Sequence, residues 1–272
     1  MRAVHEMPLR EKWLSFTFND GFEQGGHAAS KILEKFDYRG SFYVVTGWVD
    51  PATVAISDPY NMGSSHGNWS FWRALSNRGH EVGSHTNSHI KVGGTKNMLR
   101  PMLIRREMSD AYQTLRNQLG ATAVVISMPW NVSSWVSKVI ARRYYVGCLA
   151  VGSDRVKYNN LATLDRFSLK SWVPKCNQTD STNQVIKAIS GIPLGGWLII
   201  QLHSLGTEGY EPIAAKQFHA ICDFVAKREG VSVVTVRSGI RRASSTPPKL
   251  APATAAQREA LNRPLPGSLP RT

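Results

Sequence analysis

Short apolar runs bounded by turn residues recur seven times before the last stretch of the chain, and this repetition constrains the fold more than any other feature. The runs are residues 13–18, 41–46, 81–84, 123–128, 145–151, 197–202 and 231–236. Runs of this length suit strands buried on both faces, as in a parallel sheet. Helical patterns lie between several of them, at residues 27–36, 104–119, 133–143, 181–189 and 212–228. The alternation predicts an α/β fold in which seven strands with crossover helices form a closed or nearly closed barrel.

The length of the chain favours one large domain followed by a tail. A chain of 272 residues can bury one large hydrophobic core, so we expect a single barrel domain over residues 1–240. Residues 241–272 are rich in Pro, Ala, Ser and Arg and contain almost no aromatic or β-branched residues, which predicts a disordered basic tail. The three scattered cysteines form neither a disulfide framework nor a C-x-x-C motif, so we expect free thiols.

The chain is strongly basic, with a net charge of +14 and an isoelectric point near 10.0. The basic residues are spread along the sequence and accompany no nucleic-acid-binding motif, so a solvated basic surface is expected rather than a nucleic-acid partner. The first twelve residues lack the apolar core of a signal peptide, and no apolar stretch approaches the length of a membrane span. We therefore expect a cytoplasmic protein without a membrane span. Nothing in the sequence specifies its oligomeric state.

A carboxylate and two histidines suggest a metal site. Asp20 lies in the segment Thr17-Phe18-Asn19-Asp20-Gly21, and the second segment is His85-Thr86-Asn87-Ser88-His89. The four-residue spacing brings the two histidines onto one face of a helical turn or of a compact loop, and Asp20 can complete a facial set. Two imidazoles and one carboxylate leave coordination positions open for water and substrate, as a hydrolytic metal site requires.

These segments resemble the motifs of the polysaccharide deacetylases, the NodB-homology group of carbohydrate esterase family 4. That family begins with Thr-Phe-Asp-Asp-Gly at a strand end, continues with His-Thr/Ser-x-x-His after Gly-His-Glu-x-Gly-Ser, and closes with an apolar strand that ends in His. Here the run Gly79–Ser84 directly precedes His85, and the run Gly196–Leu202 directly precedes His203. The order and spacing agree over roughly residues 13 to 240.

The resemblance implies a distorted (β/α)7 barrel and a role for each matching residue. Asp20, His85 and His89 would hold a divalent ion, with zinc as the first expectation. The residue after Pro129, Trp130, would donate its backbone N–H to the oxyanion, and His203 would be the general acid for the departing amine. Gln201 stands where the family usually has the Leu that lines the acetyl pocket.

Two departures from the family pattern concern the catalytic base. The family's first Asp, the general base toward the attacking water, is Asn19 in this chain, and an amide cannot take that proton. The third motif, Arg-x-Pro-x-Gly, supplies an Arg that pairs with this Asp, and its best match here, Ser127–Asn131, lacks the Arg. Joint loss fits natural divergence, because removing only the Asp would leave a buried unpaired Arg. Glu23 lies close in sequence and is a candidate replacement for the base.

Together, the residues and the resemblance predict a zinc-dependent hydrolase that removes the N-acetyl group from an N-acetylated amino sugar in a glycan or glycoconjugate. Asn19 and Ser127 motivate one alternative, a catalytically impaired pseudoenzyme that binds metal and glycan. Gln201 and the Met128-Pro129-Trp130 segment motivate another, an amidohydrolase of a non-sugar amide.

Overall fold

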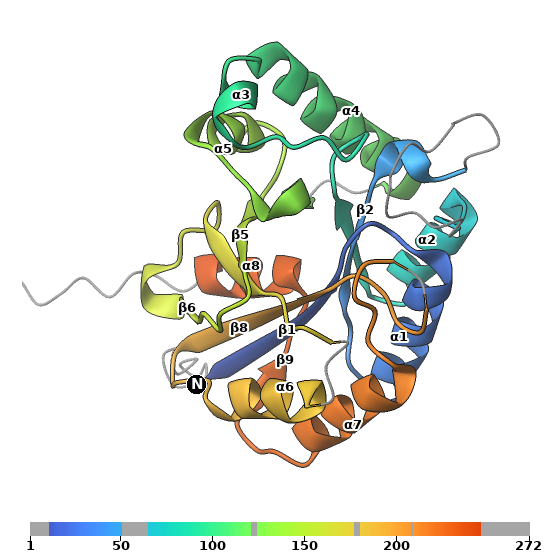
Figure 1. Ribbon diagram of the computed structural model, residues 1–272, viewed down its shortest axis with the longest axis vertical. Helices are drawn as coiled ribbons and strands as arrows, with labels where there is room; N and C mark the ends of the chain where they lie inside the picture. The colour runs from blue at the N-terminus through green and yellow to red at the C-terminus, as the bar shows by residue number, and fades with distance from the viewer. Residues whose placement is uncertain (1–10, 51–64, 121–123, 177–179, 208, 246–272) are drawn as a thin grey trace, which may run out of the picture.

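Seven parallel strands form a closed barrel in the computed structural model, which describes residues 11–50, 65–120, 124–176, 180–207 and 209–245 (Figure 1). Around the ring the strands are β1 (Lys12–Phe18), β2 (Ser41–Val44), β3 (Glu81–Ser84), β4 (Val125–Ser127), β5 (Gly147–Ser153), β7 (Leu169–Trp172) and β8 (Gly196–Leu202). β8 pairs back with β1 along almost the whole length of both strands, which closes the barrel. The β3–β4 and β7–β8 contacts are each reduced to one aligned residue pair, so the ring is irregular there. The predicted distorted seven-stranded barrel is confirmed.

The ring contains six of the seven predicted runs. The prediction that residues 231–236 form a strand of the closed barrel is wrong. The strand found there, β9 (Val231–Val233), pairs only with the first half of β1, whereas β2 pairs with the second half, so β9 lies outside the closed ring. The missing ring strand is β7, whose sequence Leu-Lys-Ser-Trp is too short and too polar to form an apolar run. A two-residue strand, β6 (Asn159–Asn160), pairs antiparallel with β8.

Helices surround the barrel (Figure 1). They are α1 (Glu23–Lys35), α2 (Trp69–Asn77), α3 (Thr95–Met98), α4 (Pro101–Leu119), α5 (Trp135–Ala141), α6 (Ser181–Ser190), α7 (Ala215–Ala226) and α8 (Val236–Ser245). α1, α4, α5, α6 and α7 occupy the predicted positions, whereas α2, α3 and α8 were not predicted. No helix within the described ranges combines the length and the apolar character that crossing a bilayer requires.

The side chains of the strands alternate between two hydrophobic layers, as the two-residue period of a strand dictates. Along β1, Leu14, Phe16 and Phe18 belong to the layer between the strands and the helices. Trp13 belongs to a separate cluster that fills the barrel. The members of that cluster from other ring strands are Tyr43, Val125, Leu149, Leu169, Trp197 and Ile199. β3 contributes Gly83 instead, because a Cβ there would overlap the ring of Tyr43.

The helix α8 covers the end of the barrel at which the strands begin. Val236 and Ile240 join the interior cluster, and the backbone N–H of Val236 donates to Ser41 Oγ at the start of β2 (3.0 Å). The helix continues through the predicted domain boundary at residue 240 and ends at Ser245. The rest of the predicted tail, residues 246–272, lies outside the described residues. The three cysteines are buried free thiols, as expected.

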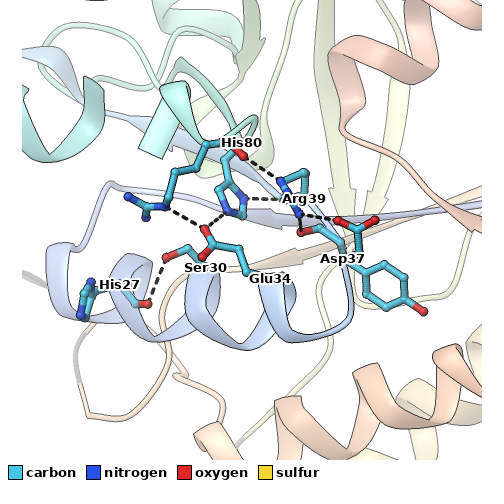
Figure 2. A network of polar contacts seen from close by, with 9 residues as sticks. His27, Ser30, Glu34, Asp37, Arg39 and His80 are labelled. Atoms are coloured by element: carbon cyan, nitrogen blue, oxygen red, sulfur yellow. Dashed lines mark hydrogen bonds and ion pairs between the residues drawn. The ribbon is translucent and has the colours of Figure 1, made fainter. Parts of the chain in front are cut away.

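His80, the residue before β3, fixes the start of that strand against α1 (Figure 2). Its Nδ1 accepts a hydrogen bond from the backbone N–H of Gly40 (3.0 Å), so its Nε2 carries the proton and donates to Glu34 Oε1 (2.9 Å). The same carboxylate oxygen accepts a hydrogen bond from Arg78 Nε (2.8 Å). His80 is thus a structural residue at the end of the barrel that α8 covers.

Candidate active site

The candidate site is built where the strands end. Asn19 and Asp20 follow β1, His85 follows β3, and His203 follows β8. The short 3-10 helix η3 (Pro129–Asn131) follows β4. Since the strands of a parallel barrel all end at the same rim, segments far apart in sequence meet there, and barrel folds place their chemistry at this rim.

The three predicted metal ligands converge. One ligand atom from each of Asp20, His85 and His89 lies within 4.8 Å of the other two. His85 Nε2 lies 3.1 Å from Asp20 Oδ1, and His89 Nε2 lies 3.4 Å from the same oxygen. Asp20 Oδ1 is buried and accepts no hydrogen bond within the described chain. A buried carboxylate oxygen facing two imidazole nitrogens fits the donor set of a divalent cation.

The orientation of His85 strengthens this fit. Its Nδ1–H donates to the backbone carbonyl of Ser127 at the end of β4 (2.8 Å), which directs Nε2 toward Asp20. In the neutral form, the Nε2 lone pair and a carboxylate oxygen then face each other at 3.1 Å. Two acceptors this close need a positive charge between them, which either a proton or a metal ion provides.

The segment from His85 to His89 is a compact loop, and its backbone is strained. Thr86 and His89 in this loop have positive φ values of 66° and 59°, and so does Asp20, which faces the loop, at 69°. A non-glycine residue in this region costs about 1–3 kcal/mol and persists only where its surroundings impose the conformation. The Thr86 hydroxyl is also buried without a hydrogen-bond partner within the described chain. The loop therefore depends on its surroundings for its shape.

Glu107 of α4 supplies much of that support. Its side chain is buried and accepts hydrogen bonds from the backbone N–H groups of Asn87 (3.2 Å) and Ser88 (2.8 Å) and from Ser88 Oγ (2.6 Å). Three bonds to the two residues between Thr86 and His89 hold the ligand loop against the helix. We did not identify Glu107 from the sequence, although a charged residue among apolar helix positions such as Ile104 and Met108 was the available signal.

The electrostatics of the site favour an ionised Asp20 carboxylate and neutral imidazoles at His89 and His203. Burial acts to raise the pKa of Asp20, but its close approach to His85 and the nearby His203 and His89 outweigh that effect, so this pKa lies well below its usual range. The pKa of His89 is lowered to about 4, first by burial and then by the charge of His85. Burial likewise lowers the pKa of His203. Neutral imidazoles beside an ionised carboxylate are the protonation states that metal ligands require.

A cavity of about 260 Å³ opens beside the three ligands. Its lining residues are Asn19, Asp20, His85, His89, Trp130, Asn131, Val173, Gln201, His203 and Tyr210. Six of the seven residues predicted for the site are among them, and the seventh, Pro129, is buried and does not line the cavity. Two of the lining residues, Trp130 and Tyr210, are 44% and 46% exposed, so two aromatic side chains of the cavity also contact solvent.

Asn19 keeps an acceptor available. Its backbone N–H bonds to the carbonyl of Leu202 (2.9 Å), and its side-chain Oδ1 is buried without a hydrogen-bond partner within the described chain. Glu23, the candidate replacement for the base, accepts a hydrogen bond from Ser65 Oγ (2.7 Å) and does not line the cavity. Asp20 is the only carboxylate among the described residues that line it.

Four further lining residues, Asn131, Val173, Gln201 and Tyr210, were not assigned a role from the sequence, and two of them contact each other. Asn131 and Gln201 are joined by a hydrogen bond from Gln201 Nε2 to Asn131 Oδ1 (2.8 Å), and Ser171 Oγ donates to Gln201 Oε1 (2.7 Å). These residues come from η3, β8 and β7, and no local sequence pattern links positions so far apart. The one signal was the presence of Gln201 where the resembled family has Leu.

Solved structures share this fold. The family 4 carbohydrate esterase domain of a multidomain xylanase from the hindgut metagenome of Trinervitermes trinervoides matches with a TM-score of 0.56 and 17% identity, over 87% of this chain and 93% of that one. A family 4 carbohydrate esterase from Streptomyces lividans matches with a TM-score of 0.56 and 14% identity, over 84% and 95%. A family 4 pseudoenzyme from Bacillus anthracis matches with a TM-score of 0.53 and 12% identity, over 85% and 66%.

Sequence comparison points to the same group. A gellan lyase from Bacillus sp is 24% identical over 212 residues, which cover 73% of this chain but only 8% of that much longer protein. The family model described as polysaccharide deacetylase matches residues 6–144, just over half of the chain. This matched region carries Asn19, the three converging ligands and η3. The chain belongs to the polysaccharide deacetylase family.

Proposed function

We propose that this protein is a metal-dependent hydrolase that removes the N-acetyl group from an N-acetylated amino sugar in a glycan or glycoconjugate. One observation carries the proposal: Asp20, His85 and His89 converge beside an open cavity that also contains His203. Membership of the polysaccharide deacetylase family supports the class of reaction. The exposed rings of Trp130 and Tyr210 support a sugar ligand, because aromatic side chains at a cavity mouth can pack on sugar rings.

Asp20, His85 and His89 would hold the ion, with zinc as the first expectation for two imidazoles and one carboxylate. When bound, such an ion polarises a carbonyl and lowers the pKa of water. The chain's own contribution is to keep Asp20 ionised and to fix His85 through the carbonyl of Ser127.

His203 is the residue we assign to proton transfer. It lines the cavity, is not one of the three ligands, and is neutral near neutral pH because burial lowers its pKa. A neutral imidazole can take a proton from the attacking water and return it to the departing amine. One residue would then serve first as base and later as acid.

Asn19 would orient the attacking water without deprotonating it. Its buried Oδ1 can accept one hydrogen bond from that water. General-base assistance is worth about 10²–10⁴ in rate, and His203 must supply it in addition to the later acid step, so we expect a slow enzyme. The backbone N–H of Trp130 is the proposed donor to the oxyanion, and the left-handed conformation of this residue, with φ at 61°, sets the direction of that N–H.

Release of acetate from a panel of N-acetylated glycans by the zinc-loaded protein tests the proposal. Small linear and cyclic amides in the same panel cover the non-sugar alternative, and His85→Ala is the metal-site control. We expect slow release that EDTA and His85→Ala abolish and that Asn19→Asp accelerates. Zinc binding without release from any substrate, by the unmodified chain or by Asn19→Asp, would reject the proposed reaction.

Asn19 also supports a second candidate, a pseudoenzyme that binds metal and glycan without turnover. No carboxylate among the described lining residues can take the place of the missing base. One structural neighbour, from Bacillus anthracis, is itself described as a family 4 pseudoenzyme, and a mutant of it as having restored enzymatic activity. Activity confined to the Asn19→Asp variant would favour this second candidate.

A further inference from the structure

Part of the cavity lining consists of two amide side chains that depart from the family pattern and contact each other. Gln201 occupies the position where the family usually has an acetyl-lining Leu, and Asn131 occupies the position of the Gly that ends the third motif. Gln201 Nε2 donates to Asn131 Oδ1 (2.8 Å). Two departures joined by a direct hydrogen bond form one unit, and both residues line the cavity beside the metal ligands.

The Gln201 amide is held at both ends. Gln201 is buried in β8, and its Oε1 accepts a hydrogen bond from the buried Ser171 Oγ of β7 (2.7 Å). With Oε1 and Nε2 both engaged, the Gln201 side chain cannot rotate without losing buried hydrogen bonds. Gln201 and Ser171 are therefore positioning residues for the Asn131 amide.

Asn131 still has donors to offer. Its Oδ1 accepts from Gln201, so Nδ2 carries two N–H groups, and no acceptor in the described chain receives them. The residue is only partly buried and lines the cavity. The cavity therefore presents an oriented amide donor. In the family pattern the two positions that form it are Leu and Gly, and neither has a polar side chain.

The surrounding backbone accommodates this side chain. Asn131 has a φ of 56°, a conformation that Gly adopts freely and that Asn tolerates better than most residues. The side chain packs against Gly152 of β5, where an added Cβ would overlap the Asn131 amide. The absence of a side chain at Gly152 and the left-handed conformation of Asn131 together leave room for the Asn131 amide.

We infer that Asn131 determines acyl specificity and that the site prefers a 2-hydroxyacetyl (N-glycolyl) group to N-acetyl, an inference that rests on the proposed function. Asn131 Nδ2 would donate to the hydroxyl oxygen of the acyl group. Hydrolysis would break the amide C–N bond, with the water oxygen joining the acyl carbon to give glycolate and a proton joining the nitrogen to give the free amine. A site built to hydrogen-bond a substrate hydroxyl discriminates against the analogue without it, because the site's own donor is then left unpaired.

Binding of the product acid tests the inference even in an inactive protein. Glycolate and propionate have nearly the same shape and differ in the hydroxyl, so calorimetry on the zinc-loaded protein gives a ratio of their Kd values. An α-hydroxy acid also chelates metal, and comparison of that ratio between wild type and variants removes this contribution. The variants are Asn131→Gly, which suits the positive φ, and Asn131→Asp, which keeps the acceptor for Gln201 and replaces the donor.

We expect both Asn131 variants to reduce the glycolate preference by about tenfold, the effect of one hydrogen bond of about 1.4 kcal/mol. Ser171→Ala should reduce it less and leave the zinc Kd unchanged. The kcat/KM ratio for N-glycolyl against N-acetyl forms of one amino sugar should fall in parallel. An unchanged Kd ratio in Asn131→Gly and Asn131→Asp would overturn the inference, whatever the turnover. Conversely, zinc-loaded protein that shows the Kd effect but hydrolyses neither substrate, even as Asn19→Asp, would reject only the proposed function.

Discussion

The two ends of the barrel each bury a carboxylate, and the two carboxylates are treated in opposite ways. At the end covered by α8, Glu81 Oε2 accepts hydrogen bonds from Ser41 Oγ (2.8 Å) and from the backbone N–H of Arg237 (2.7 Å). At the other end, Asp20 Oδ1 accepts none within the described chain and faces two histidines. Burial raises the pKa of Glu81, whereas the surrounding histidines hold the pKa of Asp20 well below its usual range. One carboxylate completes a structural network, and the other is left available to a ligand.

The backbone shows the same contrast. Five of the eight non-glycine residues with positive φ in the described chain belong to the candidate site: Asp20, Thr86, His89, Trp130 and Asn131. Among the residues that the structure describes, the three buried side-chain atoms without a hydrogen-bond partner, in Asn19, Asp20 and Thr86, are there too. Strain and unmet polar groups reduce stability, so their concentration at one end of the barrel is typical of a functional site.

Replacing Glu81 with Ala should have the largest effect on stability. The change leaves Ser41 Oγ and the N–H of Arg237 without their acceptor, at about 1–3 kcal/mol for each buried donor, so we expect a loss of about 3 kcal/mol. Urea denaturation measures it, and Glu81→Gln, which keeps an acceptor oxygen, is the matched control. The zinc Kd should not change. A large loss of zinc affinity in Glu81→Ala would contradict the separation of the two ends.

Replacing Asp20 with Ala should, unlike the change at Glu81, strongly weaken zinc binding. Removing a residue that only supports a metal ligand typically weakens metal binding by about 10- to 100-fold. Asp20 is one of the three proposed ligands, so its removal should weaken zinc binding by more than about 100-fold. Without metal the variant should also be less stable than wild type near neutral pH, because the histidines that hold the Asp20 pKa low stabilise its ionised form in the folded chain. Zinc at 100 times its Kd should stabilise the wild type by about 2.7 kcal/mol and the variant hardly at all. Equal thermal stabilisation of both proteins by zinc would remove Asp20 from the ligand set.

Glu107→Ala probes how the strained loop is held. Loss of three hydrogen bonds to Asn87 and Ser88 should loosen the loop that carries His85 and His89 and weaken zinc binding by about 10-fold. Glu107→Gln retains one oxygen for the two N–H groups and a donor for Ser88 Oγ, so its zinc Kd should stay near that of wild type. If alanine and glutamine give the same zinc Kd by calorimetry, Glu107 does not position the ligands.

Local patterns predicted most of the fold. Apolar runs found six ring strands because buried parallel strands are apolar on both faces. The pattern failed at β7, which carries the polar residues Lys170 and Ser171. Ser171 is buried there, and its hydroxyl donates a hydrogen bond to Gln201 on the neighbouring strand β8. β9 is apolar like a ring strand, and only its pairing beside β2 reveals that it lies outside the closed ring.

The candidate site divides in the same way. The convergence of Asp20, His85 and His89 was predictable because each of these candidate ligands lies in a short motif that follows a strand. The groups that surround these residues could not be predicted, because they act through contacts between residues distant in sequence. They are Glu107, the Ser127 carbonyl and the pair of Asn131 and Gln201. A sequence motif names the groups that perform the chemistry, but only the fold shows which side chains hold them in place.

The smallest expected effect is a pH dependence of stability that originates at the α8 end. Burial lowers the pKa of His80, while Glu34 opposes this and Arg39 and Arg78 add to it. The unfolded chain, with an ordinary histidine pKa near 6.5, then binds the proton first, so stability should fall as pH drops below about 6.5. His80→Gln can still accept from Gly40 and donate to Glu34 but does not titrate. Urea denaturation in EDTA at pH 7.5 and pH 5 should therefore show a smaller loss of stability in this variant than in wild type. Equal losses would mean that His80 does not cause the acid sensitivity.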